Sequence, residues 1–228
     1  MINGILLVDK AVGWTSFDAV ARIRSIVSKN ESKRVKVGHS GTLDPFATGL
    51  LQIFIGTYTK RVQEFIKQDK TYDVEMELGK TSTTGDPEGS FQVISSKKPD
   101  LESIENSLNK FTGEYLQSPP IFSAIKVAGK KAYELARKGE SVKLERRLVK
   151  IYSTKLLSYS YPYVRFTVRV SSGTYIRSLV QDIGDDLGVG AYTKQLRRTS
   201  IGDTLVTDAL TIDKCNMEEI ERKLIQLV

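Results

Sequence analysis

The stretch GHSGTLDPFATGLL, Gly38–Leu51, decides how this sequence is interpreted. Its glycines and its proline disfavour regular structure from Gly38 to Gly49. The segments on either side, Arg34–Val37 and Leu50–Ile55, are typical of strands. The sequence therefore predicts a loop held between two strands, and such loops commonly carry functional residues.

The chain upstream of this loop predicts a strand followed by a helix. Gly4–Val8 is a short apolar run typical of a buried strand. Thr15 with Asp18 three residues on resembles a capping box, which marks the start of a helix. We expect that helix to bury five apolar side chains: Phe17, Val20, Ala21, Ile23 and Val27.

Downstream, strand and helix patterns alternate. Thr71–Leu78 has the period of a strand, with Tyr72 on its apolar face and its acidic residues on a solvated face. Lys80–Ser90 is polar and predicts a mobile surface loop. The remaining expected elements are a helix capped by Asp100, a helix at Lys130–Lys138 ending at Gly139, a strand at Tyr163–Val170, a helix at Thr174–Leu187 after the Gly173 turn, and a closing helix over 217–227.

These patterns predict an α+β fold, with a mixed, mainly antiparallel sheet flanked by helices and loops. Helices and strands interleave without the strict alternation of a doubly wound parallel sheet. At 228 residues, the chain is expected to form a single main domain.

Composition limits the classes of function. The net charge of +7 and the sequence pI near 9.3 favour a polyanionic partner, although charge alone does not identify it. Cys215 and His39 are the single cysteine and histidine, so we expect neither an internal disulfide nor a metal site. With no apolar run long enough to span a membrane and no basic leader, a cytoplasmic protein is expected.

One catalytic motif competes with the loop. Ser123 and Lys126 have the spacing of the serine-x-x-lysine pattern of acyl-transferring enzymes. The companion Ser-Asp-Asn and Lys-Thr-Gly motifs are absent from the sequence, and a pattern with two fixed residues arises easily by chance. A serine acyltransferase therefore stays a minor alternative.

The Gly38–Leu51 segment resembles the catalytic loop of the TruB family of tRNA pseudouridine synthases. Four further segments resemble that family in the same order: GILLVDKAVGWTSFDAV, KTYDVEMELG, SPPIFSAIKVAGKKAYELAR and SSGTYIRSLVQDIGDDLG. Chance matches rarely preserve order. The resemblance implies the pseudouridine-synthase fold and a cofactor-free isomerisation of uridine to pseudouridine at position 55 in the T loop of tRNA.

The resemblance also assigns residues. Asp44 matches the nucleophile, and an aspartate of ordinary pKa is ionised at neutral pH. Arg177 matches the arginine that holds this carboxylate charged, and Tyr72 the tyrosine that stacks on the flipped base. His39, Tyr175 and Leu196 match positions that line the family's nucleotide pocket. Lys10, Lys60 and the group Lys194, Arg197 and Arg198 are expected to contact phosphates, and a solvated surface charge is the alternative for each.

Departures and alternatives complete the prediction. The chain ends soon after the closing helix, so we expect it to lack the PUA RNA-binding domain of bacterial relatives. By resemblance, an RNA-binding, thumb-like insertion spans about residues 119–145, with Lys126, Lys130 and Lys131 among Phe122 and Tyr133. We expect a monomer with no obligate protein partner, acting on the T arm of tRNA. A tRNA-binding or tRNA-folding chaperone without catalysis is the alternative function.

Overall fold

A computed structural model describes residues 2–123, 125–127, 129–138, 140 and 144–226, with no description of the side chains of Lys126, Lys131, Tyr133 and Arg137. The fold divides into two compact units: the first contains residues up to Tyr72 and from Leu196 onward, and the second contains Asp73–Gln195. Two strands, β4 (Lys70–Leu78) and β12 (Ala191–Ile201), contribute to both. The single catalytic domain expected from the sequence stays a prediction.

The first unit is built on a small mixed sheet in the order β14-β1-β3-β12. The β1/β14 and β3/β12 pairs are parallel, and the β1/β3 and β2/β3 pairs are antiparallel. Its elements are β1 (Gly4–Lys10), α1 (Ser16–Asn30), β2 (Val37–His39), β3 (Thr48–Ile55), η1 (Gly56–Arg61), α2 (Val62–Ile66), β13 (Thr204–Leu205), η2 (Val206–Asp208), β14 (Leu210–Thr211), η3 (Ile212–Lys214) and α6 (Met217–Lys223).

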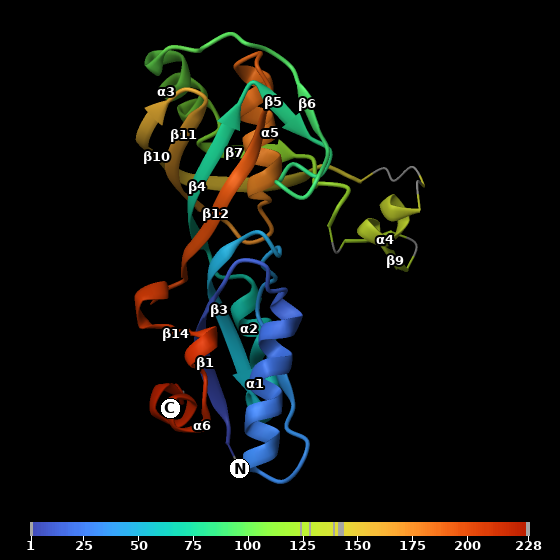
Figure 1. Ribbon diagram of the computed structural model, residues 1–228, viewed down its shortest axis with the longest axis vertical. Helices are drawn as coiled ribbons and strands as arrows, with labels where there is room; N and C mark the ends of the chain where they lie inside the picture. Colours follow the sequence, from blue (N-terminus) through green and yellow to red (C-terminus); the bar gives the residue numbers. More distant parts are fainter. Residues whose placement is uncertain (1, 124, 128, 139, 141–143, 227–228) are drawn as a thin grey trace. The chain divides into compact units, whose positions relative to one another are not determined.

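Helix α1 covers the β1/β3 face of this unit (Figure 1). Thr15 and Asp18 form the predicted capping box. The buried side chains of the helix include Val20, Ile23 and Val27, as expected. Phe17 is 65% exposed, so the expectation that it lies in the core was wrong. It lies beside the buried stripe of the helix, where its ring contacts the Arg24 guanidinium at 5.7 Å.

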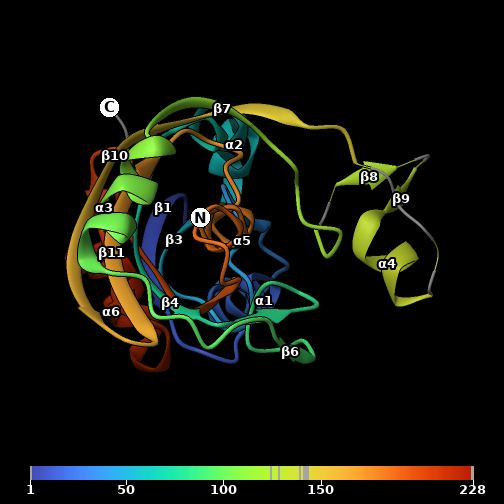
Figure 2. The same cartoon turned by 90° about the horizontal axis from the view of Figure 1, so that it is seen from above.

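The second unit has the strand order β12-β4-β11-β10-β7. Figure 2 shows β11, β10 and β7 curving around α5. Its further elements are β5 (Lys80–Ser82), β6 (Phe91–Val93), α3 (Leu101–Lys110), β7 (Gly113–Gln117), β8 (Lys126–Val127), β9 (Lys130–Lys131), α4 (Ala132–Arg137), β10 (Arg147–Ser160), β11 (Tyr163–Val170) and α5 (Ile176–Asp186). The predicted α+β fold with a mixed, mainly antiparallel sheet is confirmed.

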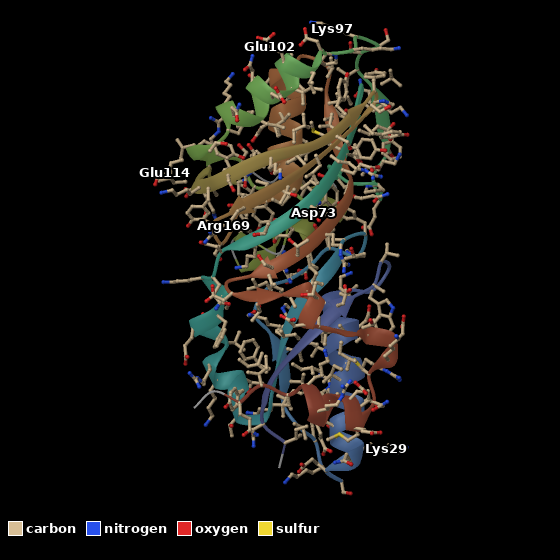
Figure 3. The ribbon with its side chains drawn as sticks, turned by 90° about the vertical axis from the view of Figure 1, so that its left-hand side faces the viewer. Lys29, Asp73, Lys97, Glu102, Glu114 and Arg169 are labelled. Carbon is tan, nitrogen blue, oxygen red and sulfur yellow. The ribbon has the colours of Figure 1, made fainter. Side chains whose placement is uncertain are left out.

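The acidic face of β4 is not solvated as the alternating pattern predicted. Glu75 and Glu77 are each 6% exposed. Arg165 of β11 donates to Glu75, while Lys80 and the Tyr192 hydroxyl donate to Glu77. Paired partners from neighbouring strands make this burial possible. Asp73 and Arg169, labelled in Figure 3, come from the adjacent strands β4 and β11, and Asp73 accepts a hydrogen bond from Thr167.

Two other expectations need correction. Within the expected surface loop Lys80–Ser90, β5 begins a hairpin with β6, and Asp86 in the connection is only 3% exposed. The closing helix α6 ends at Lys223 instead of continuing to residue 227. Leu224 is extended, and Ile225 then exchanges two backbone hydrogen bonds of 2.9 Å with Ile5 of β1.

The expected thumb-like insertion contains the β8/β9 hairpin and the short helix α4 where it is described. The sequence predicted one helix from Lys130 to Lys138, but the first two residues belong to β9. The predicted helix stop, Gly139, lies outside the described residues. The expected RNA contacts of Lys126, Lys131 and Tyr133 likewise concern side chains that are not described.

Candidate functional site

The loop that carries Asp44 is anchored from behind by Arg198 of β12. This side chain is 1% exposed, and its guanidinium donates to the backbone oxygens of Gly41 at 3.0 Å and Leu50 at 2.7 Å. At Gly49, where φ is +106°, a Cβ atom would lie 2.3 Å from the Arg198 carbonyl oxygen. Glycine is therefore required where the loop meets the strand.

Lys10 and Ser16 anchor the same loop from its other side. Lys10 has no exposed surface, and its ammonium donates to the carbonyls of Ala11 at 3.0 Å, Trp14 at 2.7 Å and Pro45 at 3.4 Å. Ser16 exchanges two hydrogen bonds with the backbone of Leu43. The structure thus gives Lys10 a supporting position, contrary to the phosphate contact expected from the sequence.

These anchors present Asp44 between two buried side chains. Leu43 is 3% exposed and Ala47 is fully buried, whereas Asp44 is half-buried. The Ala47 amide donates to the Asp44 carbonyl at 3.1 Å and closes a turn. A fixed backbone and a half-buried aspartate are consistent with what a nucleophile on a loop requires.

His39 stands at the start of this loop, on β2. Burial and the positive charge of Arg198 both lower its pKa below the ordinary value, so its ring is neutral at neutral pH. Its Nδ1 atom is buried and has no hydrogen-bond partner among the described residues. Beside it lies a hollow of about 460 Å³, whose lining includes Arg24, Arg34 and Lys36. The neutral His39 ring and three cations thus line the same hollow.

The second unit holds Arg177 in the first turn of α5, with 4% of its surface exposed. Its guanidinium donates to Asp86 Oδ2 at 3.0 Å, to the Thr84 carbonyl at 2.7 Å and to the Phe122 carbonyl at 2.8 Å. Asp86 also accepts from the Thr84 hydroxyl and the Glu88 amide. The structure therefore fixes the orientation of this arginine with a buried carboxylate.

The other predicted substrate-binding residues are distributed over both units. Tyr72 is 8% exposed on β4 and Leu196 is 8% exposed on β12, both in the first unit. Lys60 is exposed on η1, and Tyr175 of the second unit is half-buried at the N-cap of α5. The structure gathers Asp44, His39, Lys10, Lys60, Tyr72 and Leu196 in one unit and Tyr175 and Arg177 in the other.

The basic group on β12 is more structural than expected. Arg197 forms a two-pronged ion pair with Asp9, at 2.7 and 3.0 Å. Lys194 lies 3.5 Å from Glu77 and 3.6 Å above the Tyr163 ring. Arg198 is buried behind the loop. All three side chains have partners in the folded chain, so their expected phosphate contacts stay predictions at best, and for Arg198 burial argues against one.

Comparison with known proteins decides the family. Residues 28–176 match the family "TruB family pseudouridylate synthase (N terminal domain)", and residues 177–226 match "tRNA pseudouridylate synthase B C-terminal domain". The chain belongs to the TruB family. This membership confirms the resemblance inferred from the five ordered segments, and it places the chain among pseudouridylate synthases.

Individual relatives of the TruB family agree with this assignment. Proteins named tRNA pseudouridine synthase B from Cupriavidus metallidurans and Clostridium acetobutylicum are each 42% identical to the chain. The matches cover 97% and 99% of this chain, and 70% and 76% of those proteins. A solved structure of a Cbf5-Nop10-Gar1 complex has a chain that is 31% identical with a TM-score of 0.73, over 98% of this chain and 59% of that one.

Sequence reasoning missed three residues that hold the predicted site residues in place: Ser16 in the first unit, and Asp86 and Gln117 in the second. Ser16 follows the N-cap and was hidden by the capping pattern. Asp86 lies in a Thr- and Gly-rich segment that predicted a surface turn, and its partner Arg177 is 91 residues away. Gln117, which is 1% exposed, bonds the backbone of Tyr175. A local pattern does not reveal such distant partners.

Among the described residues, no group of three or more His, Cys, Asp or Glu side chains is arranged to hold a metal ion. No helix in the described part of the chain is long and apolar enough to cross a membrane.

Proposed function

We propose that this TruB-family chain isomerises uridine to pseudouridine in tRNA, at uridine-55 of the T loop. The observation that carries the proposal is the Asp44 loop, whose backbone is held by two buried cations while Asp44 itself is half-buried. Family membership and the names of the relatives support uridine isomerisation in tRNA as the reaction.

In the proposed reaction, the target uridine leaves its stack and Asp44 attacks either ribose carbon-1 or uracil carbon-6. The bond between ribose carbon-1 and ring nitrogen breaks, the ring rotates, and carbon-5 joins the ribose. The bond to Asp44 breaks in the same sequence: carbon-5 displaces the carboxylate from ribose carbon-1, or the carboxylate is expelled from uracil carbon-6. Carbon-5 loses its proton to a base and nitrogen-1 gains one, so atoms balance without a redox partner. Tyr72 serves as the platform that compensates the lost stacking.

Arg177 remains the arginine that the family pattern assigns to the nucleophile's carboxylate. Its five donors fit carboxylates in fixed geometry, and the described structure uses some of them on Asp86 and two carbonyls. Such prior anchoring reduces the reorganisation needed when charge moves during the reaction. In the proposal, Arg177 is a positive charge whose orientation is fixed before the substrate binds.

RNA binding is proposed for the hollow beside His39. Arg34 and Lys36 are exposed there and Arg24 is half-buried. Phosphate contacts of this kind supply affinity without reading sequence, and they suit a substrate recognised by shape. In the proposal, the neutral His39 ring contacts a base or a ribose hydroxyl of the T loop, which its position in the lining of the hollow supports.

The test is pseudouridine formation in an unmodified tRNA transcript, mapped to the nucleotide. Wild type is compared with Asp44→Asn and Asp44→Ala, and with Asp203→Asn as a matched control at an exposed aspartate of the first unit. We expect conversion at uridine-55 by wild type and Asp203→Asn, and none by the Asp44 variants. Binding without conversion by wild type would refute catalysis and favour the tRNA-binding chaperone.

A further inference from the structure

Gln117, the last residue of β7, makes an unusually complete set of hydrogen bonds for a side-chain amide. Its Oε1 accepts from the Tyr175 backbone N–H at 2.8 Å, and its Nε2 donates to the Tyr175 carbonyl at 3.0 Å. The second Nε2 proton is directed at the Tyr115 hydroxyl. The amide is 1% exposed, so water does not replace these bonds.

This contact lies at the start of helix α5, where the side chain of the N-cap residue, Tyr175, makes no capping hydrogen bond. The Tyr175 carbonyl accepts both from Gln117 and from the Leu179 amide, so its two lone pairs are used. Gln117 thus fixes the first peptide groups of a helix whose second residue is Arg177.

A second contact ties the same two segments together. The Ser178 hydroxyl donates to the Ser118 carbonyl at 2.7 Å, and the Arg177 guanidinium donates to the Phe122 carbonyl. The chain leaving β7 is therefore bonded to α5 at residues 175, 177 and 178. Of these contacts, the Gln117 pair alone holds the backbone of Tyr175 on both its polar atoms.

We propose that Gln117 is a positioning residue for the isomerisation, setting the backbone of Tyr175 and, through the first turn of α5, the direction of Arg177. The inference rests on the proposed function of those two residues. A displacement of about 1 Å in a positioned group is enough to reduce a rate by about a hundredfold, although the residue that moved it touches no substrate.

Glutamate at this position separates hydrogen bonding from packing. A carboxylate accepts from the Tyr175 N–H but has no proton for the Tyr175 carbonyl, which it repels. A protonated carboxyl restores both bonds. Burial raises the pKa of a carboxyl, so Gln117→Glu changes from the repelling to the bonding form as pH falls.

Other charged groups near this amide enter the comparison. The Tyr115 hydroxyl also hydrogen-bonds Asp182 of α5, whose pKa is raised to about 6 by burial and by Asp185, and lowered by Tyr115 and Arg146. Asp182 therefore has the same charged neighbours in wild type and in Gln117→Met, whereas the added carboxylate of Gln117→Glu raises the Asp182 pKa further. Each rate is for this reason divided by the wild-type rate at the same pH.

The experiment measures kcat and KM for tRNA conversion by wild type, Gln117→Glu and Gln117→Met between about pH 6 and pH 8.5, where a buried glutamate changes charge. Val164→Ala, a core truncation in β11 of the same unit, is the control for lost stability. Backbone amide exchange of Tyr175 is followed on labelled protein in parallel, because it reports the contact without catalysis.

We expect kcat of both Gln117 variants to fall by about tenfold or more at pH 8.5, with a smaller change in KM. The Gln117→Glu ratio should recover by at least about threefold towards pH 6 as the carboxyl gains its proton, and the Gln117→Met ratio should not. Tyr175 amide exchange should accelerate in Gln117→Met at pH 8.5, because methionine has no acceptor for the Tyr175 N–H, and Val164→Ala should keep its kcat.

Losses that follow thermal stability and are equal at every pH would overturn the positioning role. So would unchanged kcat in variants whose Tyr175 amide exchanges faster. If wild type converts no uridine, the proposed function fails instead, and the exchange measurement still decides whether Gln117 fixes Tyr175.

Discussion

Replacing Asp86 with asparagine removes the negative charge that faces Arg177 in the second unit. The two side chains are 4% and 5% exposed, and Arg177 Nη1 lies 3.0 Å from Asp86 Oδ2. At that distance the attraction is about 5 kcal/mol for an effective dielectric constant of about 20. Breaking a buried pair from one side typically costs about 3 to 5 kcal/mol, since the remaining charge is left uncompensated.

The contacts that survive decide where in this range the loss falls. Arg177 keeps its bonds to the carbonyls of Thr84 and Phe122, so we expect a loss near about 3 kcal/mol in the free energy of unfolding. For a chain of this length, that corresponds to a fall in Tm of about 6 to 12 °C. Urea unfolding, followed by circular dichroism, measures the loss in the free energy of unfolding.

A double variant separates stability from catalysis. Asp86→Asn combined with Arg177→Met removes both charges, so no buried charge is left uncompensated. We expect the double variant to regain most of the lost stability, while single-turnover conversion of tRNA stays lower than wild type by about a hundredfold or more. Stability loss below about 1 kcal/mol in Asp86→Asn, or activity recovered in the double variant, would refute the reasoning.

Three further predictions concern cations of the first unit. Arg34→Ala with Lys36→Ala should weaken tRNA binding and reduce the slope of log affinity against log salt by about 0.7 to 0.9 per lost phosphate contact. The control is Lys29→Ala at an exposed lysine. An unchanged slope would show that the hollow does not bind tRNA. Lys10→Met should lower kcat because the carbonyls of Ala11, Trp14 and Pro45 lose their donor. The affinity for tRNA and its salt dependence should not change. A reduced salt slope would instead support the phosphate contact expected from the sequence. Burial lowers the pKa of Lys70 to about 8 from an ordinary 10.5, so between these pH values the unfolded chain binds more protons than the folded one. The stability contributed by Lys70 should therefore rise with pH through that window. The measurement is the difference in urea midpoint between wild type and Lys70→Met, and a pH-independent difference would contradict the prediction.

Elements with strong local signals were predictable. The strand Tyr163–Val170 coincides with β11, and its alternate residues from Val164 to Val170 are buried as expected. The Thr15 and Asp100 caps mark the starts of α1 and α3. In each case the deciding interactions, a cap or a two-residue alternation, lie within a few residues along the chain.

Burial of charge was not predictable from local pattern. A lysine or glutamate in a sequence is expected to face solvent, because an unpaired buried charge is very costly. Carbonyls or countercharges from other segments of the chain form hydrogen bonds and ion pairs with Lys10, Glu75 and Arg198, and this allows these three side chains to be buried. Arg198, for example, bonds the carbonyl of Gly41, which lies 157 residues away. Only the fold brings such partners together.

The candidate site shows the same division. Asp44 and Arg177 were identified through a family resemblance that spans ordered segments, whereas Asp86 and Gln117 were missed. The first two belong to the segments that carry the resemblance. The second two bond groups 91 and 58 residues away, and their own neighbourhoods predict a polar turn and the end of a strand.

Under the proposed function, the basic residues of the chain serve two separate purposes. A glycine-containing loop that must present a nucleophile gains rigidity when its carbonyls are bound, and Lys10 and Arg198 supply donors that water cannot displace. Cations used in this way are not available to a polyanion. In the proposed function, phosphate contacts come from exposed side chains such as Arg34 and Lys36, beside the hollow at His39. Neutralising buried cations should consequently affect kcat, and neutralising exposed ones should affect tRNA affinity and its salt dependence.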